Sequence, residues 1–355
     1  MKHFSDKRVW ITGNTGFKGA WLSEMLLSAG AEVYGYSFEP PTTPSLFDQL
    51  DHRNRVHQQF ADVRDLSSLK QAFATVRPDY VFHLAAQPLV RESYSKPIET
   101  FETNVMGTAN VLEALRHWDK PLIVIIVTSD KCYRNMETGR PFDESDPLGG
   151  HDPYSASKAG AEIVAESYRQ SFLRESPVRL ATVRAGNVIG GGDWAGDRIL
   201  PDCARALAQG ETVVVRNPKA TRPWQHVMDA LGGYLQLAQQ LSGNASLQGC
   251  YNFGPDTEAN RSVQDLVETF LRHWPGEWKD DSGAASLHEA ALLHLNINKA
   301  KSELGWKPVW KFEDSVSKTA EWYHQIHLAH SEPEVIRDLT RSQIVAFSRM
   351  AGDQN

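Results

Sequence analysis

Short apolar runs alternate with segments of helical periodicity through the first half of the chain. The apolar runs predict strands over 9–12, 32–36, 56–61, 80–84, 122–128 and 179–183. Between them, apolar positions recur at helical spacing over 19–29, 66–76, 99–117 and 154–173. This alternation predicts a doubly wound α/β fold, the Rossmann arrangement, in which helices cover both faces of a parallel sheet.

The pattern becomes looser after residue 187. Helical spacing returns over 199–210, 228–241, 262–274 and 312–324, with short elements and turns between. We expect a dinucleotide-binding domain over 1–186 and a smaller α/β substrate lobe over 187–330, whose chain partly crosses back to the first domain. The tail, 331–355, predicts one amphipathic helix through Val335, Ile336, Leu339, Ile344 and Val345.

A glycine-rich turn follows the first apolar run. The run leads directly into Gly13-Asn-Thr-Gly16-Phe-Lys-Gly19, and a helical pattern then begins. Strand, glycine turn and helix are the context of a dinucleotide-binding fingerprint. Gly13 allows the tight turn, Gly16 lets the backbone approach a pyrophosphate at the helix N-terminus, and Gly19 allows the helix to pack closely on the strand. The spacing is G-x-x-G-x-x-G, and an ordinary tight turn is the weaker interpretation.

Two further segments carry groups that suit acid–base chemistry. Tyr154 and Lys158 share one helix face, and a nearby ammonium favours the phenolate form of a tyrosine. Such a pair alone is common by chance, but the glycine turn raises its weight. The run 122–128 ends in Thr128-Ser-Asp130-Lys131. Because ligands bind beyond the carboxyl ends of parallel strands, we expect Thr128, Asp130 and Lys131 to share a crevice with Tyr154.

Together these motifs resemble the extended short-chain dehydrogenase/reductase family, and within it the nucleotide-sugar 4,6-dehydratases, most of all their CDP-glucose branch. The resemblance covers about residues 7–325 and rests on Thr12-Gly-Asn-Thr-Gly-Phe-Lys-Gly19, His83-Leu-Ala-Ala-Gln87, Asn104-Val-Met-Gly-Thr108, Thr128-Ser-Asp-Lys131, Tyr154-x-x-x-Lys158, Arg184-x-x-Asn187, Arg222-Pro-Trp-Gln-His-Val-Met-Asp229 and Leu304-Gly-Trp-x-Pro308. It implies a lyase of deoxysugar and O-antigen lipopolysaccharide biosynthesis.

The resemblance implies that the cofactor is NAD. Ser37 stands where relatives place the acidic residue that holds the ribose 2′-hydroxyl. No Arg or Lys beside it favours NADP, and a reaction that recycles its cofactor suits NAD. Asn104 resembles the residue that braces the active-site helix. The cofactor-binding residues implied in this way are Gly13, Thr15, Gly16, Phe17, Gly19, Ser37, Asp62, Val63, Leu84, Ala85, Ala86, Asn104, Tyr154 and Lys158.

The resemblance also implies a role for each catalytic residue. Tyr154 takes the proton of the hexose 4-hydroxyl, helped by Lys158 and the positive nicotinamide ring, and Thr128 aligns the 4-oxygen. Asp130 is the acid that protonates the leaving 6-hydroxyl. Lys131 stands where dTDP- and GDP-sugar relatives have a glutamate base. It either acts as the C5 base in its neutral form or stabilises the enolate, and the sequence leaves both roles open.

Substrate binding is implied for four residues: Gln87 for the hexose, and Asn187, Arg198 and Arg222 for the diphosphate and nucleotide. Several readings compete with a CDP-glucose dehydratase. They are another NDP-hexose 4,6-dehydratase with a dTDP-, GDP- or UDP-sugar, a nucleotide-sugar 4-epimerase, an NADPH-linked carbonyl reductase, and a cofactor-sensing regulator without activity. An epimerase has no use for the Asp130–Lys131 pair, so that pair favours a dehydratase.

Composition narrows the partners of this 355-residue chain. A net charge of −7 without charge blocks gives no sign of nucleic-acid binding. Its three cysteines are far apart, so they predict no metal site and suit a reducing compartment. We expect a cytoplasmic protein without a membrane span or signal peptide. The resemblance implies a homodimer, in which the helices over 99–117 and 154–173 form a four-helix bundle with those of the second copy.

Overall fold

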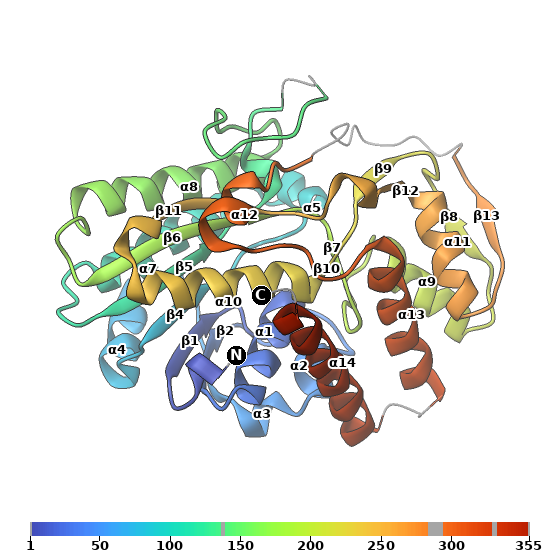
Figure 1. Cartoon of the computed structure of the whole chain (residues 1–355), viewed down its shortest axis with the longest axis horizontal. Coiled ribbons are helices and arrows are strands. Elements are labelled where there is room, and N and C mark those ends of the chain that lie inside the picture. The colour runs from blue at the N-terminus through green and yellow to red at the C-terminus, as the bar shows by residue number, and fades with distance from the viewer. Residues whose placement is uncertain (1, 136–138, 283–293, 329–331, 354–355) are drawn as a thin grey trace.

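A seven-stranded sheet forms the centre of the protein in this computed structural model, which describes residues 2–135, 139–282, 294–328 and 332–353. All strands of the sheet run parallel, and their order is β11-β6-β5-β4-β1-β2-β3 (Figure 1). Their bounds are Arg8–Thr12 for β1, Glu32–Ser37 for β2, His57–Phe60 for β3, Tyr80–His83 for β4, Leu122–Val127 for β5, Val178–Ala185 for β6 and Gly249–Phe253 for β11. The expected doubly wound parallel sheet is confirmed.

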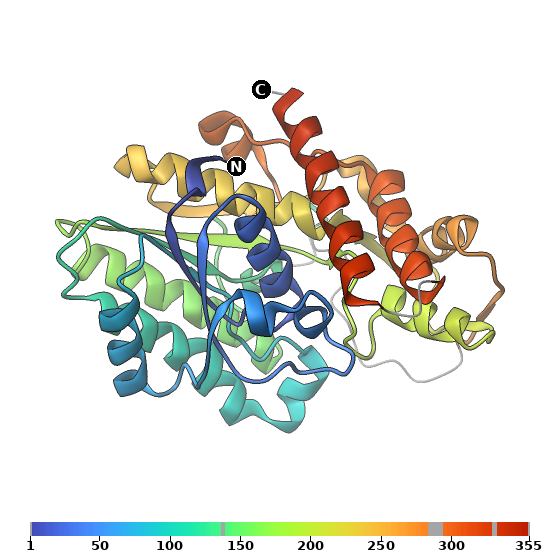
Figure 2. The same ribbon diagram turned by 90° about the horizontal axis from the view of Figure 1, so that it is seen from below.

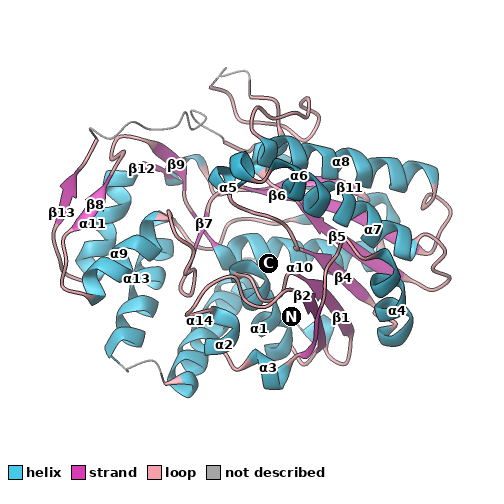
Figure 3. Ribbon diagram, turned by 180° about the vertical axis from the view of Figure 1, so that it is seen from behind, coloured by secondary structure: helices cyan, strands magenta, loops and turns pink. Residues whose placement is uncertain are grey.

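Helices cover both faces of the sheet. One face carries α1 (Phe17–Ser28) and α10 (Val227–Gly243), and the other carries α4 (Leu66–Val76), α7 (Gly107–Leu115) and α8 (Pro153–Ser171) (Figure 3). The strand β5 shows the physical reason, because all six of its side chains are buried. Its odd-numbered residues pack under α10 and its even-numbered residues under α7 and α8.

Two features of this domain were not predicted from the sequence. The seventh strand, β11, pairs with β6 after the chain has passed through the second lobe and returned along α10. The helix expected over 99–117 is divided into α6 (Pro97–Phe101), a π-helical turn η2 (Glu102–Met106) and α7. A π turn inserts an extra residue into the helix, and here it points Asn104 inward.

The second lobe is assembled from short elements beside the carboxyl edge of the sheet (Figure 1). Its strand pairs are β8 (Val213–Val215) with β13 (Trp278–Asp280), β9 (Thr221–Pro223) with β12 (Asn260–Ser262), and β7 (Val188–Ile189) with β10 (Gln225–His226). Its helices are α9 (Ile199–Ala208), α11 (Val263–His273) and α13 (Phe312–Leu328). The remaining short elements are η1 (Lys2–Phe4), α2 (Leu46–Gln49), α3 (His52–Arg55), α5 (Val90–Ser95), η3 (Asp130–Cys132), η4 (Ala245–Leu247), η5 (Thr257–Ala259) and α12 (Asn298–Leu304).

The tail forms the expected helix, α14 (Pro333–Asp353), which bridges the two parts of the molecule. Figure 2 shows it in red between α13 and the blue α1, and it contacts both. Arg341 donates to the buried carboxylate of Glu24 in α1, and Thr340 accepts from the indole of Trp322 in α13. Among the described helices, none is both long enough and apolar enough to cross a lipid bilayer.

Candidate active site

The glycine turn connects β1 to α1 at the carboxyl edge of the sheet. Gly13 has φ +71°, and a Cβ there would lie 2.7 Å from the backbone nitrogen of Ala85. A Cβ on Gly19 would collide with the carbonyl oxygen of Gly13. A Cβ on Gly16 would meet only that carbonyl oxygen, at 3.5 Å. The protein's own packing therefore requires Gly13 and Gly19, whereas Gly16 leaves open space at the N-terminus of α1.

The N-terminus of α1 suits an anion. Gly16 is the N-cap, and no side chain caps the helix, so its first N–H groups are available to a ligand. Phosphate groups bind at such ends because the N–H groups and the helix dipole both favour negative charge. The open space over Gly16 and the uncapped helix end together fit a dinucleotide pyrophosphate.

The end of β2 offers a neutral polar cluster at the expected ribose position. Ser37 donates to the amide oxygen of Asn14 at 2.9 Å, and Asn14 donates to Gln58 at 2.6 Å. Thr15 donates to the carbonyl oxygen of Phe38 at 3.0 Å, which holds the glycine turn against the end of β2. Among the residues of this cluster none carries a charge that would bind a 2′-phosphate.

The next predicted cofactor residues lie directly after strands β3 and β4. Asp62 forms an ion pair with Arg64 at 2.7 Å, and the carbonyl oxygen of Val63 accepts from Asn110. The N–H groups of Leu84 and Ala85 donate to the Thr12 hydroxyl, 3.1 Å each. Ala86 follows, half-buried. These small residues keep the backbone after β4 close to the glycine turn.

Asn104 joins this edge to the helix that carries Tyr154 and Lys158. Its amide oxygen accepts from the backbone nitrogen of Gln87, and its amide nitrogen donates to the Ser157 hydroxyl at 2.8 Å. Gln87 does not expose its side chain as a hexose contact would require. Its amide is bonded to Leu89 and Thr100, so it holds its own loop together.

Helix α8 presents Tyr154 and Lys158 at the end of β5. The Lys158 ammonium donates to the carbonyl oxygen of Val127 at 3.2 Å. Burial and the cation of Lys18 lower the pKa of Lys158 to about 8. Burial raises the pKa of Tyr154 to about 12, although the Ser129 hydroxyl lowers it. Burial therefore outweighs the lowering that we expected from Lys158.

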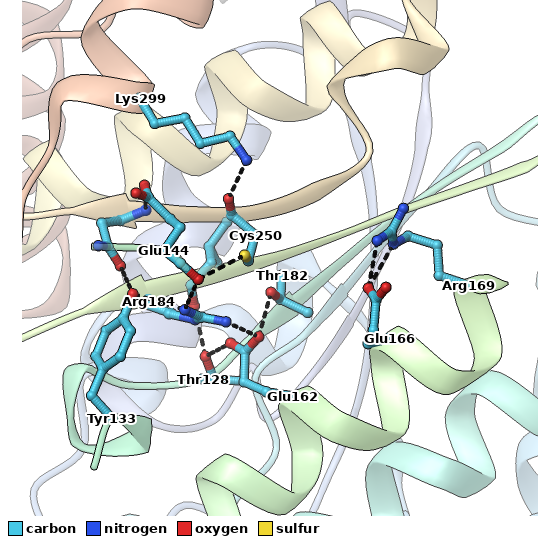
Figure 4. A network of polar contacts seen from close by, with 12 residues as sticks. Thr128, Tyr133, Glu144, Glu162, Glu166, Arg169, Thr182, Arg184, Cys250 and Lys299 are labelled. Atoms are coloured by element: carbon cyan, nitrogen blue, oxygen red, sulfur yellow. Dashed lines mark hydrogen bonds and ion pairs between the residues drawn. The ribbon is translucent and has the colours of Figure 1, made fainter. Parts of the chain in front are cut away.

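The structure corrects the expectation for Thr128. Its hydroxyl donates to the buried carboxylate of Glu162 in α8 and lies 3.2 Å from the carbonyl oxygen of Val183 (Figure 4). The reason is the two-residue period of a strand, which places Thr128 on the same sheet face as Val124 and Ile126. Thr128 thus points beneath α8, away from a hexose in the crevice.

Ser129, and not Thr128, is the hydroxyl on the side of Tyr154. Its side chain lies close enough to Tyr154 to lower the pKa of that phenol, and it donates to Asp130 at 3.0 Å. It accepts from the backbone nitrogen of Lys131, which fixes the short turn η3. The alternation along 122–128 was the signal that could have distinguished Ser129 from Thr128 in the sequence.

Asp130 and Lys131 start η3 directly beyond the strand. Burial raises the pKa of Asp130 above its usual range, although Lys131 and Lys18 favour its charged form. A Cβ on Gly186, directly after β6, would lie 2.9 Å from the Asp130 carboxylate, so a larger residue there would displace that carboxylate. Asp130 is therefore a buried carboxyl that holds its proton more readily than an exposed one, as a general acid requires.

The predicted diphosphate residues lie on the second lobe, next to the same crevice. Arg198 forms an ion pair with Asp193 at 3.1 Å and lowers the pKa of Tyr154, which places its guanidinium near the phenol. Asn187 is exposed between β6 and β7. Arg222, in β9, donates to the carbonyl oxygen of Thr221.

Two further residues of the crevice were missed by sequence reasoning. Burial and Arg198 lower the pKa of Lys18 to about 8, while Asp130 raises it. Lys18 thus lies near Asp130 and Arg198, although the sequence analysis marked other residues of the turn, Phe17 and Gly19 among them, and not Lys18. The hydroxyl of Tyr234 in α10 is fully buried and without a hydrogen-bond partner in the described part of the chain. Burial, Asp130 and Tyr154 raise its pKa, so it lies near both.

A family model described as GDP-mannose 4,6 dehydratase matches residues 10–319. The chain belongs to this family. CDP-glucose 4,6-dehydratase of Salmonella typhimurium is 44% identical over 325 residues, which cover 89% of this chain and 90% of that protein. A dTDP-glucose 4,6-dehydratase of Xanthomonas campestris pv. campestris is 26% identical and covers 88% of this chain and 92% of its own length.

Solved structures share the fold of this dehydratase-family chain. DesIV of Streptomyces venezuelae, a dTDP-glucose 4,6-dehydratase with NAD and TYD bound, aligns with a TM-score of 0.75 at 23% identity and covers 90% of this chain and 97% of its own. UDP-glucose 4-epimerase of Thermotoga maritima aligns with a TM-score of 0.76 at 19% identity and covers 90% and 99%. Dehydratases and epimerases therefore share this scaffold, and the residues of the crevice must distinguish them.

The glycine turn makes a testable prediction about cofactor binding. Gly16→Val fills the open space at the N-terminus of α1 without a clash inside the protein, so it should weaken dinucleotide binding by ~10-fold or more. Isothermal titration with NAD measures this directly. Gly243→Val is the matched control, since a Cβ there meets nothing within 4 Å and the residue ends α10, away from the glycine turn. Equal NAD affinity in the Gly16 variant and the wild type would contradict the site.

Proposed function

We propose that the protein converts CDP-glucose to CDP-4-keto-6-deoxyglucose and water, with NAD as a recycled cofactor. The observation that carries this proposal is the joint placement of Asp130 and Lys131 beside Tyr154 at the edge of the sheet. The carboxyl group of Asp130 and the amine of Lys131 suit the elimination of water, and Tyr154 suits the oxidation of an alcohol. The identity of 44% to a CDP-glucose 4,6-dehydratase supports the choice of nucleotide.

The site fits NAD in several places. Gly16 and the N-terminus of α1 would hold the pyrophosphate, and the neutral cluster of Ser37, Asn14 and Gln58 would face the ribose. Asp62 and Val63 would border the adenine. Bound NAD would supply the acceptor for the hydride that leaves C4, and its reduced form would supply the same hydride to C6. One turnover therefore consumes no cofactor.

The first chemical step removes the proton of the hexose 4-hydroxyl. We assign this to Tyr154, with Ser129 in place of Thr128 as the hydroxyl that aligns the 4-oxygen. With a pKa of about 12, Tyr154 is protonated at neutral pH in the ligand-free crevice. Its phenolate must therefore be stabilised by cations that gather there, namely Lys158, Arg198 and the positive nicotinamide ring.

The second step eliminates water across C5 and C6. The 4-ketone acidifies the C5 proton, and the 6-hydroxyl leaves as water after it accepts a proton. Asp130 supplies this proton, because burial favours its protonated form. Lys131, beside it, either takes the C5 proton in neutral form or stabilises the enolate as a cation. Reduction at C6 and protonation at C5 then complete the product.

The diphosphate of a sugar nucleotide is negatively charged, and cationic side chains of the second lobe can bind it. Arg198 and Arg222 would bind the diphosphate, with Asn187 as an uncharged donor. Arg198 is the residue that connects the two halves of the site, because it acts on both Tyr154 and Lys18.

A panel of nucleotide sugars tests the proposed reaction. Purified protein with NAD should convert CDP-glucose to a 4-keto-6-deoxy product faster than dTDP-, UDP- or GDP-linked sugars, by ~10-fold or more in kcat/KM. Mass spectrometry detects the loss of one water. Formation of CDP-galactose without loss of water would support the epimerase instead, and steady consumption of NADPH would support a carbonyl reductase.

Tyr154 and Asp130 should fail at different steps, because they serve different bonds. Tyr154→Phe should slow reduction of bound NAD by ~10²-fold to ~10⁴-fold, whereas Asp130→Asn should reduce NAD normally and then stall before water is lost. Stopped-flow absorbance of reduced NAD, together with deuterium uptake at C5, separates the two. Wild-type dehydration by Asp130→Asn, or normal NAD reduction by Tyr154→Phe, would refute these roles.

We also propose that two copies pair through α6, η2 and α8. Within the range 99–117 that we expected to form this interface, Val111, Leu112 and Leu115 are buried in the chain's own core and cannot serve it. Large apolar side chains are instead exposed at the beginning of the first helical segment and along the second, namely Ile98, Phe101, Met106, Ile163 and Phe172. The exposed apolar residues of this patch lie on or directly beside helical segments, so they could pack against the same segments of a second copy in a four-helix bundle.

The patch makes a prediction about assembly. The wild type should sediment as a dimer at micromolar concentration, and Ile163→Glu should weaken that dimer by ~100-fold, because a two-fold axis brings two new charges into one apolar interface. Leu328→Glu is the control, since Leu328 is 65% exposed on α13 and Ile163 is 59% exposed on α8. A monomeric wild type, or equal dimerisation of both variants, would contradict this interface.

A further inference from the structure

A buried carboxylate lies on the side of helix α8 that faces the central sheet. Glu162 of α8 is 3% exposed, and its two oxygens accept from three side chains on the ends of two strands. Thr128, beyond β5, donates to one oxygen. Thr182 and Arg184, in β6, donate to the other at 2.7 and 2.8 Å. Figure 4 shows these donors converging on Glu162 from the sheet.

The spacing along α8 connects this carboxylate to the chemistry. Tyr154, Lys158 and Glu162 follow one another at intervals of four residues, so they lie along one face of the helix. Two of them bind consecutive residues at the end of β5. Lys158 donates to the carbonyl oxygen of Val127, and Glu162 accepts from Thr128. The next residues of that chain are Ser129, Asp130 and Lys131.

We propose that Glu162 is a positioning residue for the dehydration. Its contacts fix the position of α8 relative to the end of β5, and they thereby align Tyr154 and Lys158 with the turn from Ser129 to Lys131. This inference rests on the proposed function for its reaction. Glu162 lies beneath the crevice and acts through Thr128 and Lys158. One carboxylate thereby fixes the tyrosine of the first step relative to the acid of the second.

Arg184 holds the carboxylate of Glu162 in a fixed position. Its guanidinium lies 4.8 Å from the ring centre of Tyr133 and donates to the Tyr133 hydroxyl at 2.7 Å. That hydroxyl donates to Asn252 of β11 at 2.7 Å, and Asn252 in turn donates to the carbonyl oxygen of Phe142. The carboxylate is therefore held by a chain of contacts that reaches the edge strand of the sheet.

Glu162 also faces Lys158 as a charge. The charged and titratable groups around Lys158 are Lys18 of α1, His83 of β4, Cys132 of η3 and Glu162 of α8. Burial lowers the pKa of His83 to about 3, so this imidazole is neutral, and Lys18 opposes the charge of Lys158. Glu162 favours that charge. Without its carboxylate, Lys158 should lose its proton at a lower pH.

Glu162→Gln tests the inference while it keeps the shape of the side chain. Single-turnover NAD reduction with CDP-glucose should slow by ~10-fold to ~100-fold, as expected for a small misplacement of reacting groups. The alkaline limb of its pH profile should move to lower pH, because Lys158⁺ is less stabilised. Glu166→Gln is the matched control, one turn further along α8, where Glu166 pairs with Arg169 on the surface. Wild-type rate and pH profile in Glu162→Gln would overturn the inference.

A second variant separates positioning from stability. Glu162→Gln leaves the buried Arg184 without its counterion, which alone can destabilise the fold. The double variant Glu162→Met with Arg184→Met removes both charges and should recover thermal stability, yet NAD reduction should stay slow. Recovery of both would show that Glu162 serves stability only. Thr128→Val should slow the same step and combine less than additively with Glu162→Gln, because both variants alter the same contact.

A measurement without substrate keeps this inference apart from the proposed function. Nuclear magnetic resonance of the protein with ¹³C-labelled lysine, assigned with Lys158→Met, gives the titration of Lys158. Its midpoint should fall in Glu162→Gln and stay unchanged in Glu166→Gln. An unchanged midpoint in Glu162→Gln would overturn the electrostatic part of the inference. If no nucleotide sugar is dehydrated by the wild type, the proposed reaction fails while this titration still decides the role of Glu162.

Discussion

The proposed chemistry depends on one contact between layers, the position of helix α8 against the end of strand β5. The ammonium of Lys158 reaches the last carbonyl oxygen of the strand at 3.2 Å, and Glu162 holds the residue after it. Because the strand continues into Ser129, Asp130 and Lys131, the same contact locates both halves of the proposed reaction. The parallel sheet then brings the glycine turn and the residues after β4 to this edge as well.

Burial is the second constraint, and it acts on five ionisable groups of the crevice. It raises the pKa values of Tyr154, Asp130 and Tyr234, and it lowers those of Lys18 and Lys158 to about 8. Each shift favours the neutral form of the group. The shifts bring Asp130, Lys18 and Lys158 closer to neutral pH, where they can exchange protons, whereas Tyr154 needs nearby cations before it can act as a base.

The sequence predicted those features that depend on neighbouring residues. The turn through Gly13 and Gly19 and the face shared by Tyr154 and Lys158 follow from spacing alone, and the structure has both. The choice between Thr128 and Ser129 depends on which sheet face α8 covers, so the motif alone led to the wrong hydroxyl. The π turn places Asn104 against Gln87 and Ser157, contacts that are distant in sequence and could not be predicted from it. The strand β11 forms only because β6 lies beside it, and a run with Cys250 and Asn252 gave little apolar signal.

The position of β11 in the chain has a consequence for how the protein is made. This strand is synthesised after β7, β8, β9, β10 and helix α9 of the second lobe, yet it is the outermost strand of the central sheet, beside β6. Until residue 253 has emerged, β6 is an open edge with unpaired N–H and C=O groups, which can pair with strands of other chains. The first 186 residues are therefore not a module that can be cut out and moved to another protein, and a nascent chain must keep that edge covered until its second lobe is well under way.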